Sequence, residues 1–155
     1  MKSILALIEK INSIKKEIGY KVEAPISDLE LSKFINQFNN KYGFAPPRVY
    51  LQVLALSNGI NFNGTFFYGV TESSNLDFID SNLNWESDFE FKKFIFYADS
   101  EQYLFVQSLQ NKLFSFHPRD RFETTIFETT DEELFFQIIL ECALGEDIES
   151  KYYDI

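Results

Sequence analysis

Residue types that usually carry catalysis are scarce in this chain of 155 residues. It has one cysteine, Cys142, and one histidine, His117, and it contains neither HExxH nor CxxC. An internal disulfide is therefore excluded, and a zinc site built from histidine and cysteine would lack ligands. The phosphate-binding patterns GxxxxGKS/T and GxGxxG are also missing, so we do not expect the nucleotide sites that depend on them.

Long apolar runs are missing as well. No stretch approaches the ~18 consecutive apolar residues of a membrane-spanning helix. The apolar start of the chain, residues 4–8, is shorter than the ~7–15 residues at the centre of a signal peptide, and no small-residue cleavage site follows it. We therefore expect no membrane partner, and cytoplasmic residence is the simplest interpretation.

Positive charge is scarce in the second half of the chain. Residues 1–70 carry eight Lys and Arg against five Asp and Glu, a net charge of +3, whereas residues 71–155 carry six against nineteen, a net charge of −13. Because phosphates would be repelled, we expect no direct nucleic-acid partner. The acidic half would instead attract a basic protein and speed their encounter. Alternatively, the acidity only keeps a protein rich in phenylalanine soluble.

Four amphipathic helices are indicated by apolar residues that recur at steps of three and four. Gly19 and Gly43 stand where the first two helices should end, a position that glycine often takes. Capping boxes open the second helix at Ser27–Glu30 and the last at Thr130–Glu133, since a hydroxyl and a carboxylate three residues apart can satisfy backbone N–H groups. The expected ranges are 4–18, 27–42, 46–56 and 130–144.

Beyond residue 60 the apolar spacing falls from about 3.6 residues towards two, which is typical of strands. Phenylalanine is favoured on strands and supplies most of the 17% aromatic content. Gly64 marks a bulge or a tight turn. Residues 71–90 are acidic and weakly periodic, so we expect a long loop there with a short helical turn at 76–79. We expect about five antiparallel strands, over 60–70, 94–97, 103–106, 113–116 and 125–127.

This order of elements indicates an α+β fold, with N-terminal helices, a central and mostly antiparallel sheet, and a C-terminal helix. The helices are expected to pack on one side of the sheet. The length, without an internal repeat or a low-complexity linker, fits a single domain over 1–155. We expect Tyr152 and Tyr153 to order part of the acidic tail.

Two side chains were considered as catalytic groups. His117 and Ser115 lie two residues apart on one predicted strand, so they share a face and could form a base–nucleophile pair. A histidine at a strand end before proline is more typical of a surface or turn residue. Cys142 lies on the apolar face of the last helix, where a buried and unreactive thiol is expected.

Carboxylates occur in close pairs, which could serve glycoside hydrolysis or bind a divalent metal. Because carboxylates recur along the whole second half, a solvated acidic face is the plainer interpretation. We therefore predict no catalytic residue, no cofactor and no metal. The pairs are Asp77 with Asp80, Asp88 with Glu90, and Asp99 with Glu101.

Four segments together resemble the SUKH superfamily. Residues 46–59 read PPRVYLQVLALSNG, a proline start and a tyrosine-bearing helix that ends in serine-asparagine-glycine, and 65–69 read TFFYG, an aromatic-glycine strand. Residues 94–100, FIFYADS, resemble the family's strand that ends in alanine-aspartate, and 129–134, TTDEEL, resemble the start of its final helix. The resemblance covers most of 28–144. One departure is SEQY at 100–103, where many members have glycines.

The resemblance implies a SUKH-like α+β core over about 28–144 and a non-catalytic binding role. Bacterial members are commonly immunity proteins that bind and neutralise a cognate toxin, often a nuclease or a deaminase, and a fungal branch regulates cell-wall assembly. We therefore expect an immunity protein with a basic toxin partner. The alternatives are a regulatory or scaffold module without a toxin, and a carboxylate-based enzyme or metal binder.

Partner-facing residues are expected in the long acidic loop and in the turn after the second strand, because functional residues concentrate in such segments. Trp85 lies in the same loop. It is either an interface hot spot or a ring that covers the core. The predicted set is Asp77, Asp80, Trp85, Glu86, Asp88, Asp99 and Glu101.

Overall fold

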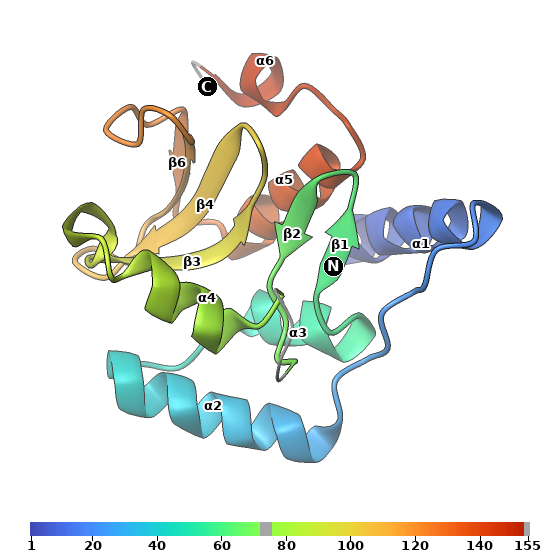
Figure 1. Cartoon of the computed structure of the whole chain (residues 1–155), viewed down its shortest axis with the longest axis horizontal. Helices are drawn as coiled ribbons and strands as arrows, with labels where there is room; N and C mark the ends of the chain where they lie inside the picture. Colours follow the sequence, from blue (N-terminus) through green and yellow to red (C-terminus); the bar gives the residue numbers. More distant parts are fainter. Residues whose placement is uncertain (72–75, 154–155) are drawn as a thin grey trace.

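Helices α1, α2 and α3 open the chain (Figure 1) and span Lys2–Glu17, Asp28–Tyr42 and Arg48–Leu56. The computed structural model describes residues 1–71 and 76–153. All of these helices were predicted from the apolar spacing. None of the helices within the described ranges combines the length and the apolar content needed to cross a membrane.

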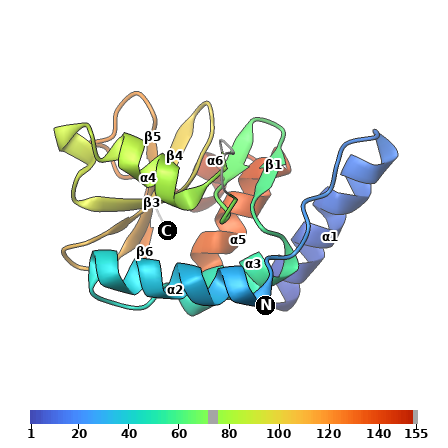
Figure 2. The same ribbon diagram turned by 60° about the horizontal axis from the view of Figure 1, so that its bottom comes forward.

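The predicted ends of the first two helices are confirmed. Gly19 and Gly43 adopt φ values of +77° and +79°, and Ser27 caps α2 by accepting a hydrogen bond from the Glu30 backbone N–H. α2 then packs on the aromatic core, with the Phe34 ring in contact with Tyr50. In Figure 2, α2 runs along the bottom of the molecule, next to α3.

A single antiparallel sheet follows, with six strands among the described residues in the order of the chain. One strand more is present than expected, because the predicted strand over 60–70 folds back on itself. Asn63 and Gly64 both have positive φ, +52° and +77°, the conformation of a two-residue hairpin turn. The strands are β1 Ile60–Phe62, β2 Thr65–Phe67, β3 Phe94–Asp99, β4 Tyr103–Ser108, β5 Phe114–Pro118 and β6 Phe127–Thr129.

The loop predicted over 71–90 is wrong for much of its described part. It contains helix α4, Phe78–Trp85, and the 3-10 turn η1, Phe89–Phe91. Residues 72–75 of that predicted loop lie outside the described residues. The apolar spacing did not indicate this helix because a polar residue lies in the middle of its buried face. Phe78 is followed four residues later by Asn82, which is also buried.

The Asn82 amide explains why a polar residue is tolerated there. It donates to the Phe96 carbonyl (2.9 Å) and accepts from the Phe96 backbone N–H (2.7 Å). β2 pairs with β3 only at Ala98 and Asp99, so the Asn82 side chain replaces a missing neighbouring strand at Phe96. Because a buried backbone group without a partner is costly, this residue fixes α4 to the sheet.

The chain ends in two elements, α5 over Glu132–Ala143 and α6 over Ile148–Tyr152. The predicted capping box is displaced by one residue, since Asp131 and not Thr130 caps α5 by accepting from the Leu134 backbone N–H. In the tail, Tyr152 is buried as expected. Tyr153 is exposed and does not anchor the tail.

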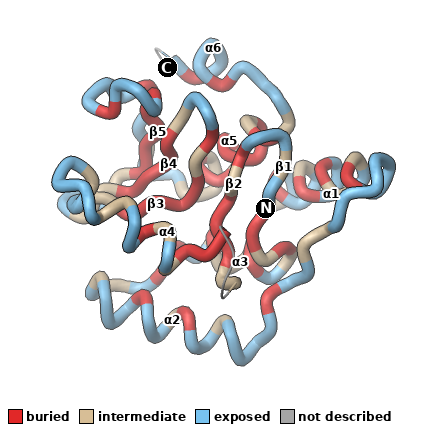
Figure 3. The backbone as a smooth tube through the Cα atoms, in the orientation of Figure 1, coloured by how far each residue is buried: buried red, intermediate tan, exposed pale blue. Residues whose placement is uncertain are grey.

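The expectation that helices cover one side of the sheet is wrong, because both faces are covered (Figure 1). Consecutive residues of β3 point to opposite faces. The Tyr97 ring meets Phe136 of α5 (5.3 Å between centroids), whereas the Phe96 ring stacks on Trp85 of α4 (4.7 Å). Figure 3 shows the buried residues running through the sheet and the inner sides of the helices.

Close contacts explain the residues around the end of α3. The buried Tyr50 hydroxyl donates to the Tyr68 carbonyl at 2.6 Å. The Asn58 amide donates to the Val70 carbonyl (2.9 Å) and accepts from its N–H (2.7 Å). Gly69 must be glycine, since a Cβ there would lie 2.5 Å from the Asn58 carbonyl carbon. Tyrosine, asparagine and glycine are thus required by this junction between helix and sheet.

Replacing Leu54 by Ala should destabilise the protein by about 2–5 kcal/mol, because the fully buried side chain would leave a cavity. Urea unfolding measures the change in unfolding free energy. Leu29→Ala is the matched control, since Leu29 is 81% exposed on α2 and its loss should change stability by less than about 0.5 kcal/mol. Equal losses in the two variants would contradict the observed packing of α3.

Candidate functional site

Two adjoining hollows of about 480 and 440 Å³ lie at one end of the sheet. Their walls come from the β1–β2 turn, the β3–β4 turn, the loop after β5, and the link between α5 and α6. We call this region the end cleft and define it by the residues that line both hollows: Glu101, Gln102, Tyr103 and Glu149. Each hollow is large enough for a side chain or a small ligand.

Carboxylates dominate the larger hollow. Glu101, Glu146, Asp147 and Glu149 all line it. Glu146 pairs with Lys151 (3.5 Å) and Asp147 caps α6. In contrast, neither Glu101 nor Glu149 forms an ion pair with any other residue of the described ranges. Two carboxylates are therefore available to an incoming cation.

Tyr103 contributes a protonated hydroxyl to the wall between the hollows. Partial burial, and then the negative charge of Glu149, raise the pKa of Tyr103 to about 12. Its phenol therefore remains neutral at physiological pH and can donate a hydrogen bond to a ligand. The half-buried ring also packs edge-on against Phe116 (5.6 Å between centroids), which fixes its position.

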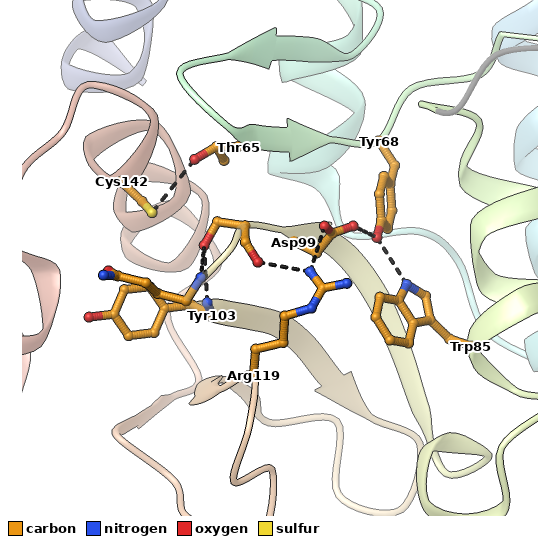
Figure 4. Close-up of polar contacts among 9 residues, drawn as sticks. Thr65, Tyr68, Trp85, Asp99, Tyr103, Arg119 and Cys142 are labelled. Carbon is orange, nitrogen blue, oxygen red and sulfur yellow. Dashed lines mark hydrogen bonds and ion pairs between the residues drawn. The ribbon is translucent and has the colours of Figure 1, made fainter.

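Side-chain hydrogen bonds shape the floor of the larger hollow (Figure 4). The Ser100 hydroxyl accepts from the backbone N–H groups of Gln102 (3.3 Å) and Tyr103 (3.0 Å). The turn at 100–103 is thus held by serine and does not need the glycines that it lacks. Thr65 and Cys142 lie beside it, with 3.7 Å between oxygen and sulfur. Burial raises the pKa of the Cys142 thiol, which keeps it protonated.

A polar network borders the smaller hollow (Figure 4). The Arg119 guanidinium donates to Asp99 Oδ1 (3.0 Å) and to the Ser100 carbonyl (2.8 Å). The other Asp99 oxygen accepts from the Tyr68 hydroxyl, and Trp85 Nε1 donates to the same hydroxyl at 2.9 Å. Asp99 therefore connects residues from four different segments and is not a free surface carboxylate.

One face of the Trp85 ring contacts the core, and the other faces Arg119 near the surface. Its ring stacks on Phe96 with an interplanar angle of 9°, and the Arg119 guanidinium lies 5.4 Å from its centroid on the way to solvent. Trp85 thus acts as the ring that covers the core. Its Arg119-facing side borders the end cleft, because Arg119 lines the smaller hollow.

The predicted partner-facing residues fall into two groups. Asp99 and Glu101 lie at the end cleft, where Trp85 joins them through the network. The second group lies along α4: Asp77 caps its start, Asp80 lies on it, and Glu86 and Asp88 follow it. Of this second group, only Asp80 is exposed and has a carboxylate that forms no hydrogen bond or ion pair with another described residue.

Asp77 does not occupy the exposed loop in which the sequence suggested it. It is buried, and its carboxylate caps α4 by accepting from the backbone N–H groups of Asp80 (2.9 Å) and Thr71 (3.0 Å). Burial raises its pKa. Glu86 pairs with Lys41 of α2 at 3.1 Å, and Asp88 caps η1. The helix in this segment thus accounts for three carboxylates that a loop would have left free.

Sequence reasoning missed Glu146, Asp147, Glu149 and Arg119. Glu146, Asp147 and Glu149 lie far from 99–103 in the chain and meet it because α5 returns across the sheet. Arg119 is brought there by the pairing of β5 with β4. The excess of negative charge in residues 71–155 was the one available signal, and it carries no information about position.

His117 and Ser115 do meet, with 2.8 Å between Nε2 and Oγ. His117 is buried, however, so a surface or turn position is wrong. Its Nδ1 lies 3.1 Å from the Thr124 carbonyl. A carbonyl can only accept, so Nδ1 carries the proton and the Ser115 hydroxyl donates to Nε2. Phe122 packs on the imidazole at 4.4 Å, and the pair anchors the loop after β5 in the core.

Replacing His117 by Asn should flatten the pH dependence of stability on the acid side. Burial lowers the pKa of His117 in the folded protein, whereas in the unfolded chain it titrates near its ordinary ~6.5. The unfolded state therefore takes up the proton first as the pH falls, and stability is lost progressively below about pH 6.5. Urea unfolding at about pH 7.5 and pH 5.5 should show a larger loss for the wild type than for the variant. Equal losses would mean that His117 titrates normally in the fold.

No three His, Cys, Asp or Glu side chains within 1–71 and 76–153 are arranged to hold a metal ion. Comparison of the sequence with models of protein families finds no match, and comparison with curated proteins finds none either. The SUKH resemblance therefore remains a hypothesis that depends on the motif residues. A function has to be argued from the end cleft and its charges.

Proposed function

We propose that this chain is a non-enzymatic protein-binding domain of the SUKH type, acting as a cytoplasmic immunity protein that neutralises a basic toxin domain. The observation that carries the proposal is the end cleft. Its two hollows share the free carboxylates of Glu101 and Glu149, and Glu146 and Asp147 add further negative charge to the larger one.

Charge complementarity supports a basic partner. A cleft with one predominant sign of charge raises the local concentration of an oppositely charged protein and accelerates association. A nuclease presents lysines and arginines to the phosphates of its substrate. Carboxylates at 101 and 149 would occupy the positions of those phosphates and so block the active site.

The rigidity of the cleft favours binding. Ser100 holds the turn that carries Glu101, and Arg119 bonds both to the Ser100 carbonyl and to Asp99. Side chains that are already in place lose less conformational entropy when a partner binds. The Tyr103 ring, which lines both hollows, adds the kind of aromatic contact that dominates protein interfaces.

The possible reactive groups are engaged in the fold itself. His117 and Ser115 are buried and bonded to each other, so a substrate could not reach this pair without displacing the loop after β5. The Cys142 thiol lines the larger hollow, but its raised pKa keeps it in the unreactive protonated form. These contacts support binding and give no support to acyl transfer.

Reversing the two shared carboxylates should slow association with the toxin. We expect the neighbouring gene to encode that toxin as a basic domain. The Glu101→Lys/Glu149→Lys variant should associate with it at least ~10-fold more slowly than the wild type at ~0.15 M salt, because steering attraction becomes repulsion. Stopped-flow or surface plasmon resonance measures the rate, and growth of cells that produce both proteins measures protection.

The matched control is Glu9→Lys/Glu17→Lys, which alters two exposed carboxylates of α1 and changes the net charge by the same amount. It should retain most of the association rate. If both variants slow association equally, only net charge matters and the end cleft is not the interface. If the neighbouring gene encodes no toxin, and no toxin domain is bound, the immunity function is wrong and a regulatory module replaces it.

A further inference from the structure

An exposed aromatic ring lies in the turn η1, which follows α4 directly. The Phe89 side chain is 83% exposed. Phe91 of the same turn points inward and packs against Trp85 (5.4 Å), Phe96 (5.4 Å) and Phe122 (5.0 Å between centroids). Because Phe91 anchors the turn, Phe89 is held out in solvent on a rigid support.

The charges beside Phe89 are balanced, unlike those of the surrounding half of the chain. Asp88 and Glu90 flank the ring, and Lys92 and Lys93 follow directly. All of these charged residues are exposed, and none forms an ion pair with another residue in the part of the chain that the structure describes. Residues 88–93 therefore form a neutral, apolar-centred patch, which we call the Phe89 patch, on a half that carries a net charge of −13.

We propose that the Phe89 patch is a self-association surface through which two copies of this chain form a dimer about a two-fold axis. In such an interface the same patch meets itself, so each charge must find its opposite on the other copy. The Phe89 patch meets this requirement: Asp88 and Glu90 of one copy face Lys92 and Lys93 of the other, and the two Phe89 rings lie near the axis.

Charge also explains why a second copy fits this patch better than the basic partner of the end cleft. Lys92 and Lys93 would repel a basic protein, and Lys92 lies over the Phe89 ring itself, 5.9 Å from its centroid. Elsewhere on the acidic half, two copies would repel one another. Within residues 71–155, the Phe89 patch is a place where two copies of this acidic chain can meet without like-charge repulsion.

The dimer is expected to be weak. Stable interfaces bury about 1,200–2,000 Å² in total, and six residues around one exposed ring provide less than that. We expect a dissociation constant on the order of 100 µM, since contacts this small lie at the weak end of specific interfaces. The full-length protein should therefore be a monomer when dilute and a dimer at high concentration.

Sedimentation equilibrium of the purified protein, from ~10 µM to ~1 mM, tests the proposal. At ~0.15 M salt, the repulsion between the net charges of two copies is screened beyond ~8 Å. Phe89→Ala should weaken self-association at least ~10-fold, the loss expected for a central aromatic anchor. Leu29→Ala is the control, because Leu29 is equally exposed, at 81%, on α2; it should associate like the wild type.

A charge swap tests the two-fold arrangement itself. Glu90→Lys and Lys92→Glu should each abolish the dimer, because like charges then meet across the axis, whereas an equimolar mixture of the two variants should dimerise again. Both positions are exposed, so the fold is retained, and a thermal melt verifies this. A wild type that is monomeric at all concentrations overturns the proposal. So does a Phe89→Ala variant that associates normally, or a mixture that associates no better than its components.

Discussion

Tyr68 is the residue on which both the fold and the candidate site depend. Its carbonyl accepts from the Tyr50 hydroxyl of α3, and its backbone N–H donates to the Tyr97 carbonyl of β3. Its own hydroxyl reaches Asp99, which in turn holds Arg119 at the end cleft. The core tyrosine of α3 and the surface arginine are therefore connected through one residue. A shift of the helix against the sheet would alter the cleft, which links the packing of the core to the proposed binding role.

The buried amide of Asn82 and the half-buried amide of Asn58 play a similar part where the sheet lacks a neighbouring strand. Asn58 pairs with the backbone of Val70, and Asn82 with that of Phe96. An asparagine side chain presents N–H donors beside a carbonyl acceptor, so it can replace a peptide group of a missing strand. These two residues close gaps in the hydrogen bonding of the sheet and attach α3 and α4 to it. They also explain why a strongly aromatic core contains polar side chains at fixed places.

The proposed surfaces differ in their charges and so in the partners that they can accept. The larger hollow of the end cleft is lined by four carboxylates and by no Lys or Arg, which suits a basic protein, whereas the Phe89 patch carries both signs and suits its own copy. Trp85 at the end of α4 stacks on the sheet, and η1 follows directly. The Phe89 patch shares no residue with the lining of the end cleft, so the two proposed contacts use different side chains.

The amino-acid sequence by itself determined the elements with a regular apolar period: α1, α2, α3, α5 and most of the strands. Their burial pattern is local, since side chains three or four residues apart share a helix face and alternate residues share a strand face. The sequence pattern did not predict α4, because the polar Asn82 occupies the buried face of that helix. The hydrogen bonds that make this residue favourable there form only when β3 lies beside it. The pattern did not predict the hairpin of β1 and β2 either, since Gly64 is compatible with both a bulge and a turn.

The candidate site was less predictable than the fold. Trp85, Asp99 and Glu101 belong to the set predicted from the sequence, whereas Glu149 and Arg119 do not, because only the return of α5 and the loop after β5 bring them to the cleft. Charge is a property of the sequence, whereas the place where charges meet is decided by tertiary contacts between segments far apart in the chain.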